Sequence, residues 1–155
     1  MIVVSDTSPI LNLAAVGKLS LLRDLYSEII IPPAARRELE SKGIELDLSW
    51  MWVVAAGDRT ELARLRTRLD PGEAEAIIVA TEIKADLLLA DERRGRRIAM
   101  EYGLEVTGLL GVLAEAKVRG IIEHCQPVLD EMILVAGFWL SEGLRTRYLG
   151  DLGEI

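Results

Sequence analysis

Short apolar runs alternate along the chain with segments in which apolar residues recur at helical spacing. The runs at residues 2–4, 29–31, 87–90 and 104–106 predict short buried strands. Helices are predicted on both sides of Gly17 and over residues 34–39, 58–69, 70–84, 92–102, 109–118, 128–135 and 138–149. Residues 43–57, which include Trp50 and Trp52, fit either a strand or a turn of helix. Strands and helices therefore alternate over most of the sequence.

This alternation predicts an α/β fold. Parallel strands that are joined by right-handed crossover helices form a sheet that is covered on both faces. We therefore expect a three-layer α/β/α sandwich with a mainly parallel central sheet. The length of 155 residues fits about one average domain, and no linker or internal repeat divides the chain. We expect a single domain over residues 1–155 that is helical in its C-terminal part.

The composition excludes several classes of protein. Hydrophobic residues make up 50% of the chain and charged residues 28%, which is unlike a disordered segment. The longest apolar run, residues 133–140, is far shorter than the roughly 18 to 20 residues that cross a bilayer. Residues 1–10 contain no basic side chain and include Asp6, unlike a signal peptide. We therefore expect a cytoplasmic protein that makes no contact with a membrane.

The rare residue types limit the chemistry that the chain can perform. The single cysteine, Cys125, excludes an internal disulfide, and the single histidine, His124, leaves no set of ligands for a typical zinc site. Neither a GxxxxGK[ST] nor a GxGxxG motif is present to bind ATP or NAD. The net charge of −7 gives no general attraction to nucleic acid, so any such contact must be local. We expect His124 and Cys125 to be structural and any metal site to use carboxylates.

Four acids are predicted near one edge of the sheet. Asp6 and Asp91 each end a predicted strand, and Glu38 and Glu73 lie early in predicted helices. Ligands of open parallel sheets bind beyond the carboxyl ends of the strands, where the following helices begin. Carboxylates that gather there repel one another unless protons or cations compensate them. A hard cation such as Mg²⁺ or Mn²⁺ takes oxygen ligands and can promote hydrolysis of a phosphodiester.

Each of these acids also has a structural interpretation. The alternatives are a helix cap for Asp6 or Ser8, an i, i+4 ion pair of Glu38 with Lys42, a capping box of Asp70 with Glu73, and a helix cap for Asp91. Taken singly, each acid fits its structural role well. Only their predicted location at one edge of the sheet favours a shared chemical role.

The residues around the acids resemble the PIN domains, and within them the VapC-like toxin ribonucleases, over nearly the whole chain. The resemblance rests on Val3-Val4-Ser5-Asp6-Thr7-Ser8, Ile31-Pro32-Pro33-Ala34-Ala35-Arg36-Arg37-Glu38-Leu39 and Leu87-Leu88-Leu89-Ala90-Asp91. Counting back from Asp91 places the family's third acid at Glu73. Most relatives have Asp at that position, so Glu75 remains a competitor. The stretches Asp-Thr-Ser-Pro, Pro-Gly-Glu and Asp-Glu-Arg-Arg-Gly-Arg-Arg resemble a less-characterised sub-branch of the family.

The resemblance implies an endoribonuclease that uses Mg²⁺ or Mn²⁺ to hydrolyse RNA, and that serves as the toxin of a type II toxin–antitoxin pair. Its catalytic residues and metal ligands would be Asp6, Glu38, Glu73 and Asp91. Ser8, Glu75 and Glu92 would either support these ligands from outside or take the place of one of them. Toxins of this kind usually form homodimers and are inhibited by a small antitoxin protein. Two alternatives stay open, namely a structure-specific DNA nuclease and a non-catalytic module that binds RNA or protein.

Basic and aromatic residues add two weaker expectations. Arg93, Arg94, Arg96 and Arg97 follow Asp91 closely enough to contact the phosphates of RNA, or else form a solvated helix face that pairs with Glu92 and Glu101. Both interpretations stay open. Trp50, Trp52 and Trp139 are in principle able to stack on bases, but in so apolar a chain tryptophans are more often core or interface residues.

Overall fold

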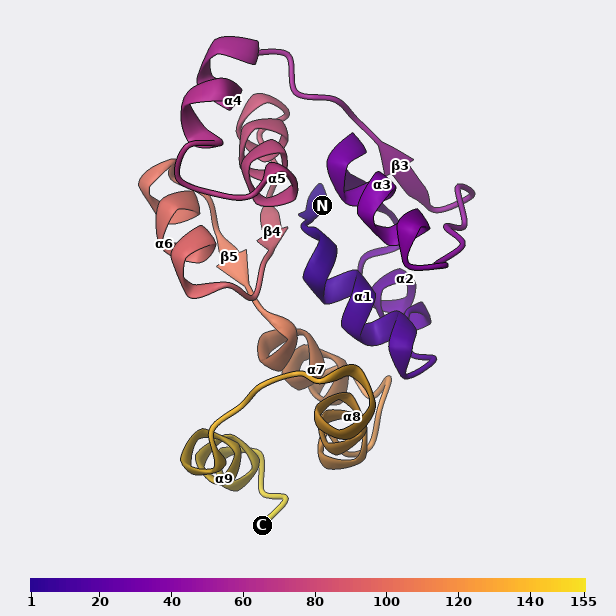
Figure 1. Cartoon of the computed structure of the whole chain (residues 1–155). Coiled ribbons are helices and arrows are strands. Elements are labelled where there is room, and N and C mark those ends of the chain that lie inside the picture. Colours follow the sequence, from indigo (N-terminus) through magenta and orange to yellow (C-terminus); the bar gives the residue numbers. More distant parts are fainter.

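The computed structural model, which describes residues 1–155, contains a single five-stranded sheet in which all strands are parallel (Figure 1). The strands are β1 (Val3–Ser5), β2 (Ile29–Ile31), β3 (Met51–Val53), β4 (Leu87–Leu89) and β5 (Val106–Thr107). Their order in the sheet is β3-β2-β1-β4-β5. The predicted parallel sheet is therefore confirmed, and the unassigned segment 43–57 supplies its edge strand β3.

Helices connect the strands and continue after β5. They are α1 (Thr7–Ala15), α2 (Ser20–Tyr26), α3 (Pro33–Ser41), α4 (Arg59–Leu65), α5 (Pro71–Glu82), α6 (Arg93–Glu101), α7 (Leu109–Val118), α8 (Gln126–Glu131) and α9 (Glu142–Asp151), with a π-helical turn, η1 (Met132–Ala136), directly after α8. In Figure 1, α7, α8 and α9 lie together at the lower end of the view, away from α4 and α5. None of these helices is both long enough and apolar enough to span a membrane.

Three predicted helices have different bounds in the structure. The helix predicted over residues 58–69 ends at Leu65, and the helix predicted over 128–135 changes to the π-helical turn η1. Gly137, at a φ of 72°, has the left-handed backbone that ends η1. Residues 138–140 are not helical, because the next helix begins only after Ser141, whose hydroxyl accepts a hydrogen bond from the Leu144 N–H.

Two apolar clusters pack against opposite faces of the sheet. Val3, Ile29, Ile31 and Leu89 belong to a cluster with α1, α2, α7 and α8, whereas Val4 and Leu88 belong to one with α4, α5 and α6. Successive side chains of a strand point to opposite faces, so Val3 and Val4 enter different clusters. The helices therefore cover both faces, and the predicted α/β/α sandwich is confirmed.

The strand order sets where a ligand can bind. The chain reaches the edge strand β3 and then returns past β1 to β4, so the order reverses between β1 and β4. Ligands of open α/β sheets bind at such a switch point, beyond the carboxyl ends of the strands. β1 and β4 pair over three residues, with Ser5 opposite Leu89. The residues that follow, Asp6 and Asp91, thus lie at the expected binding edge.

Candidate functional site

Asp6 is held at the carboxyl end of β1, where α1 begins. Its backbone N–H donates to the Leu89 carbonyl oxygen at 3.0 Å, and its Oδ1 accepts from the Thr7 N–H at 2.7 Å. The residue is only 4% exposed. The cap predicted for Asp6 is therefore confirmed. The bond to Thr7 occupies Oδ1, and the carboxylate still needs compensation because it is buried.

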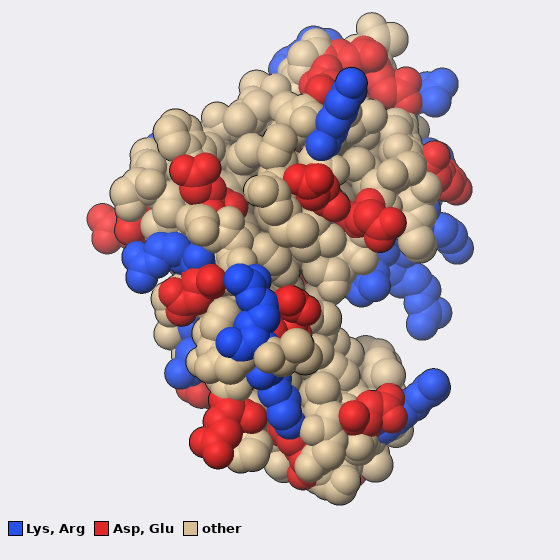
Figure 2. Space-filling model, turned by 180° about the vertical axis from the view of Figure 1, so that it is seen from behind, with Lys and Arg blue, Asp and Glu red and all other residues tan.

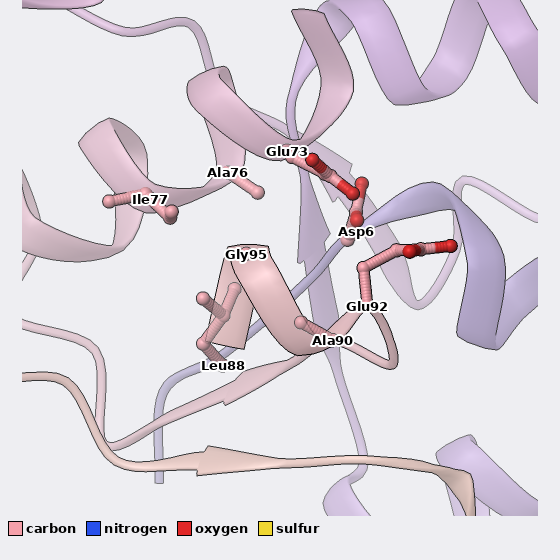
Figure 3. Close-up of a pocket in the computed structure, with 8 residues that line it drawn as sticks. All are labelled: Asp6, Glu73, Ala76, Ile77, Leu88, Ala90, Glu92 and Gly95. Carbon is pink, nitrogen blue, oxygen red and sulfur yellow. The ribbon is translucent and has the colours of Figure 1, made fainter. Parts of the chain in front are cut away.

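Glu73 comes to the same place from the first turn of α5. Asp70 caps this helix by accepting a hydrogen bond from the Glu73 N–H at 2.9 Å. The return bond of the predicted capping box, from the Asp70 N–H to the Glu73 side chain, is absent, so that the Glu73 carboxylate is not used by the cap. Asp6 and Glu73 line one pocket, together with Ala76, Ile77, Leu88, Ala90, Glu92 and Gly95. Figure 3 shows the Asp6 and Glu73 carboxylates pointing toward one another. A Cβ on Gly95 would lie 3.6 Å from the Glu73 carboxyl carbon, so the glycine lets α6 pack close to this side chain.

Both carboxyl groups are destabilised in their charged form. Burial, and the negative charges of Glu73, Asp70 and Glu38, raise the pKa of Asp6 to about 7, against the lowering effect of the Thr7 N–H. Burial, and the charges of Asp70 and Glu92, raise the pKa of Glu73 to about 7. Near neutral pH the pair therefore favours a proton or a cation between its oxygens.

Asp91 lies beyond β4 and is tied to the start of α7. Its Oδ1 accepts a hydrogen bond from the Leu109 N–H at 2.8 Å, so it caps α7 and not α6, which begins next to it. Its Oδ2 is buried and has no hydrogen-bond partner. Burial raises the pKa of Asp91, and the Leu109 N–H and the charge of Arg96 oppose this shift. Asp91 is not among the residues that line the pocket of Asp6 and Glu73, but its Oδ2 has no hydrogen-bond partner in the protein.

The fourth predicted acid, Glu38, does not line the pocket. It is exposed on α3, although Ala34, Ala35 and Leu39 of the same helix are buried. It forms no ion pair with Lys42, so that structural alternative is wrong. Its charge nevertheless contributes to the raised pKa of Asp6.

The alternate residues Glu75 and Ser8 also lie outside the pocket. Glu75 is 8% exposed, and its Oε2 accepts a hydrogen bond from the Ala34 N–H at 3.1 Å, in the first turn of α3. The Ser8 hydroxyl accepts from the Asn12 side-chain amide at 3.2 Å. Glu73 and Glu75 thus point in different directions from α5, and Glu73 is the one that joins Asp6. Glu92 lies at the rim of the pocket, where it is exposed.

The four arginines of α6 differ in their surroundings. Arg93, Arg94 and Arg97 are exposed, and Arg96 is partly buried. None forms an ion pair with Glu92 or Glu101, and Glu101 instead lies 3.7 Å from the Arg68 guanidinium. Of the second interpretation, the solvated face agrees with the structure at Arg93, Arg94 and Arg97, whereas the pairing with Glu92 and Glu101 is wrong. Acidic and basic side chains alternate over the face in Figure 2, with no continuous basic surface there.

Sequence reasoning missed several residues around the acids. The Thr7 hydroxyl is buried without a partner, and a Cβ on Gly72 would lie 3.1 Å from it and 3.3 Å from Asp6 Oδ1. The Leu109 N–H donates a hydrogen bond to Asp91, which lies 18 residues earlier in the sequence, and Gly108 leaves room for the Asp91 carboxylate. A glycine before an acid or an apolar helix, as at Gly72 and Gly108, is the one sequence signal of this close packing.

The donor set fits a hard cation that is bound by few protein ligands. No three Asp, Glu, His or Cys side chains lie close enough together to enclose a metal ion. Mg²⁺, however, commonly binds through one or two carboxylates and keeps several water molecules. The facing oxygens of Asp6 and Glu73 supply such a pair. The unpartnered Asp91 Oδ2 follows the neighbouring strand β4 at the same edge of the sheet, outside the pocket that these two acids line.

Comparisons with known proteins agree with this fold. The family model DUF3368, described as a PIN domain, matches residues 2–154. A solved PilT N-terminus domain protein from the hyperthermophilic archaeon Sulfolobus solfataricus has 24% identity and a TM-score of 0.60, and the match covers 75% of this chain and 93% of that one. A search of curated proteins found no match. The family match covers nearly the whole chain, and the chain therefore belongs to the PIN-domain family.

Proposed function

We propose that the protein is an endoribonuclease that depends on Mg²⁺ or Mn²⁺ and hydrolyses the phosphodiester bonds of RNA. PIN domains are typically nuclease domains and typically use divalent metal ions. The facing carboxylates of Asp6 and Glu73 carry the proposal, because both have a pKa raised to about 7 and lie at the switch point of the sheet. A bound divalent cation relieves their repulsion.

The residues of the site divide the work by their surroundings. Asp6 and Glu73 would hold the cation, which when bound would lower the pKa of water and neutralise charge on the phosphate. Asp91 Oδ2, which is buried without a hydrogen-bond partner, would join them as a further oxygen ligand. Arg93 and Arg94, exposed at the start of α6, bind the flanking phosphates of the RNA. Glu92, at the rim of the pocket, and Glu38, outside it, would orient water around the site.

The cellular role that we propose is that of a toxin in a type II toxin–antitoxin pair. This part of the proposal rests on the motifs that resemble VapC-like toxins, and it includes a homodimer and a small inhibitory antitoxin. A short reading frame with a DNA-binding pattern directly upstream of the gene, whose product copurifies with this chain, would support it. A gene with no such neighbour, and a chain that does not arrest growth when expressed, would refute the toxin role but not the nuclease.

Cleavage by matched variants tests the proposed activity. Purified protein with Mn²⁺ should cut a structured RNA. Asp6→Asn, Glu73→Gln and Asp91→Asn should each lower kcat by about 100-fold or more, which is the usual effect of removing an essential charged group from an active site. Asp24→Asn removes an exposed carboxylate of α2 that makes no side-chain hydrogen bond, and it should leave cleavage unchanged. Glu38→Gln should have a smaller effect than Asp6→Asn, because Glu38 lies outside the pocket.

The substrate panel separates the alternatives. Single-stranded and branched DNA of matched length are compared with the RNA. Cleavage of DNA alone would replace the proposed substrate with that of a structure-specific DNA nuclease. Tight binding of RNA or of a protein partner, without cleavage and without a response to Mn²⁺, would identify a non-catalytic module. Equal cleavage by the wild type and all three site variants would mean that a contaminant is the nuclease.

A further inference from the structure

The Asp91 carboxylate is fixed by one oxygen only. Oδ1 accepts from the Leu109 N–H at 2.8 Å, and Oδ2 is buried without a partner. A carboxylate held at a single oxygen can still turn about its Cβ–Cγ bond, and turning would exchange the bound and the free oxygen. A second contact, besides the bond from the Leu109 N–H, must therefore oppose rotation of the Asp91 carboxylate if Oδ2 is to keep a fixed position.

Gly108 provides one restriction, through the space that it leaves. A Cβ on this residue would lie 2.8 Å from Asp91 Oδ1 and 2.6 Å from an Arg96 guanidinium nitrogen, Nη1, and both distances are too short for real contacts. The Gly108 backbone has a φ of −104°, which any residue adopts, so conformational freedom does not explain the glycine. Close approach explains it, since the carboxylate and the guanidinium both pack against the Gly108 backbone.

Arg96 provides the second restriction. It is the only one of the four α6 arginines that is partly buried, and Arg93, Arg94 and Arg97 are exposed. Its charge acts on Asp91, although the two groups do not form a direct ion pair within 4.0 Å. A guanidinium at this place attracts the carboxylate toward Gly108 and Leu109 and opposes its rotation away from them.

We propose that Arg96 and Gly108 are positioning residues, which hold the Asp91 carboxylate with Oδ1 on the Leu109 N–H and Oδ2 free for a ligand at the site. The proposal rests on the proposed nuclease function and deepens it. It also divides the arginines of α6, because Arg96 acts on the protein's own carboxylate, whereas the exposed arginines are left to contact phosphates. Arg96 is then not a phosphate-binding residue, in contrast to the expectation from the sequence.

Manganese affinity and steady-state cleavage, measured together, test this role. Free Mn²⁺ is followed by electron paramagnetic resonance during titration of the wild type and of Arg96→Ala, Arg96→Lys and Gly108→Ala. Outer residues of metal sites typically change affinity by about 10- to 100-fold when they are removed. We expect Arg96→Ala and Gly108→Ala to weaken Mn²⁺ binding by about 10-fold or more and to lower kcat, with KM for RNA nearly unchanged. Arg96→Lys keeps the charge and should recover most of the affinity.

Arg147→Ala is the matched control, because Arg147 is an exposed arginine of α9 without an ion pair. It removes the same charge far from Asp91 in the fold and should change neither Mn²⁺ affinity nor kcat. Thermal unfolding of each variant confirms that it is folded. If Gly108→Ala does not fold, Arg96→Ala and Arg96→Lys still decide the outcome.

The possible results separate this proposal from the proposed function. A raised KM for RNA in Arg96→Ala, with unchanged Mn²⁺ affinity, would assign Arg96 to phosphate binding and overturn the positioning role. Unchanged affinity and unchanged kinetics would overturn it as well. A wild type that neither binds Mn²⁺ nor cleaves RNA would instead refute the nuclease function itself, together with any positioning role for it.

Discussion

Neutralising Asp6 should make the metal-free protein more stable while it abolishes activity. The proposed variant is Asp6→Asn, which keeps an oxygen to accept the hydrogen bond of the Thr7 N–H and removes the buried charge. Ordinary substitutions of a buried, hydrogen-bonded residue destabilise a protein. The opposite result is expected here because burial and neighbouring acids oppose the charged form of Asp6.

The size of the effect follows from the pKa of Asp6, which is raised from 3.8 to about 7. At about 1.4 kcal/mol per pKa unit, ionised Asp6 destabilises the native state by about 4 kcal/mol above pH 7. The substitution also costs about 1 kcal/mol of stability, because the hydrogen bond from the Thr7 N–H to asparagine is weaker than the one to a charged carboxylate. Asp6 and Glu73 repel each other, so part of the stability gained on removing the Asp6 charge comes from easier ionisation of Glu73. We expect a net gain of about 2 to 3 kcal/mol.

The pH dependence gives the sign of the effect. A carboxyl whose pKa is higher in the folded than in the unfolded protein loses stabilisation as the pH rises through that interval. The metal-free wild type should therefore lose stability relative to Asp6→Asn between about pH 4 and pH 7. The two proteins should be equally stable below pH 4, where Asp6 is protonated in both states. Above pH 7 their difference should be constant.

Urea unfolding in EDTA, at several pH values from 3.5 to 8.5, measures these differences, and Asp24→Asn serves as the control. Mn²⁺ at millimolar concentration should stabilise the wild type by binding its folded state, and should stabilise Asp6→Asn much less. The reasoning would be refuted by an Asp6→Asn variant that is less stable than the wild type at pH 8, or by two proteins with parallel pH profiles.

Three further predictions concern residues outside the proposed catalytic machinery. The Glu154 side chain is 3% exposed and accepts hydrogen bonds from Lys117 Nζ and two backbone N–H groups. These donors hold the pKa of Glu154 at about 2, although burial raises it. Glu154→Gln should therefore lower the free energy of unfolding in urea by about 2 kcal/mol at pH 7 and match the wild type near pH 2. Glu75→Ala should lower the free energy of unfolding by about 1 to 3 kcal/mol, because the Ala34 N–H loses its hydrogen-bond partner, and Glu75→Gln should lower it less. Neither variant should lose Mn²⁺ affinity. A loss of affinity in both would mean that Glu75 belongs to the metal site. Trp139 is 83% exposed, so Trp139→Ser should change the free energy of unfolding by less than about 0.5 kcal/mol, and a larger loss would mean that it packs in the core.

Much of this fold could be predicted from local pattern. The apolar runs of β1, β2 and β4 are buried on both faces, so they stand out from the polar residues that end them. Asp6 and Asp91 lie where those runs stop, and parallel pairing brings their strand ends to one edge. The choice of Glu73 over Glu75 was also open to reasoning, because two positions of a helix separated by two residues lie about 200° apart.

The unpredicted features depend on tertiary contacts. β3 is apolar in sequence, but its middle residue, Trp52, is 52% exposed, and only backbone pairing with β2 identifies the segment as a strand. The helix predicted over residues 128–135 changes to the π-helical turn η1, in which Leu134 is 85% exposed. The orientation of Glu38 follows from how α3 packs, and the bond of Asp91 to Leu109 joins elements that only the complete fold brings together. No local pattern encodes such relations.

β1 precedes the other four strands in the sequence, yet it lies in the middle of the sheet with neighbours from distant parts of the chain. Val4 is paired with Ile30 on one side and with Leu88 on the other, and the Asp91 cap comes from Leu109. Contacts between such distant segments form slowly and late in folding. Asp6 can therefore meet Glu73 only after residue 73 has been made, and the bond from the Leu109 N–H to Asp91 can form only after residue 109 has been made. More than two thirds of the chain must thus be synthesised before all parts of the proposed nuclease site can come together.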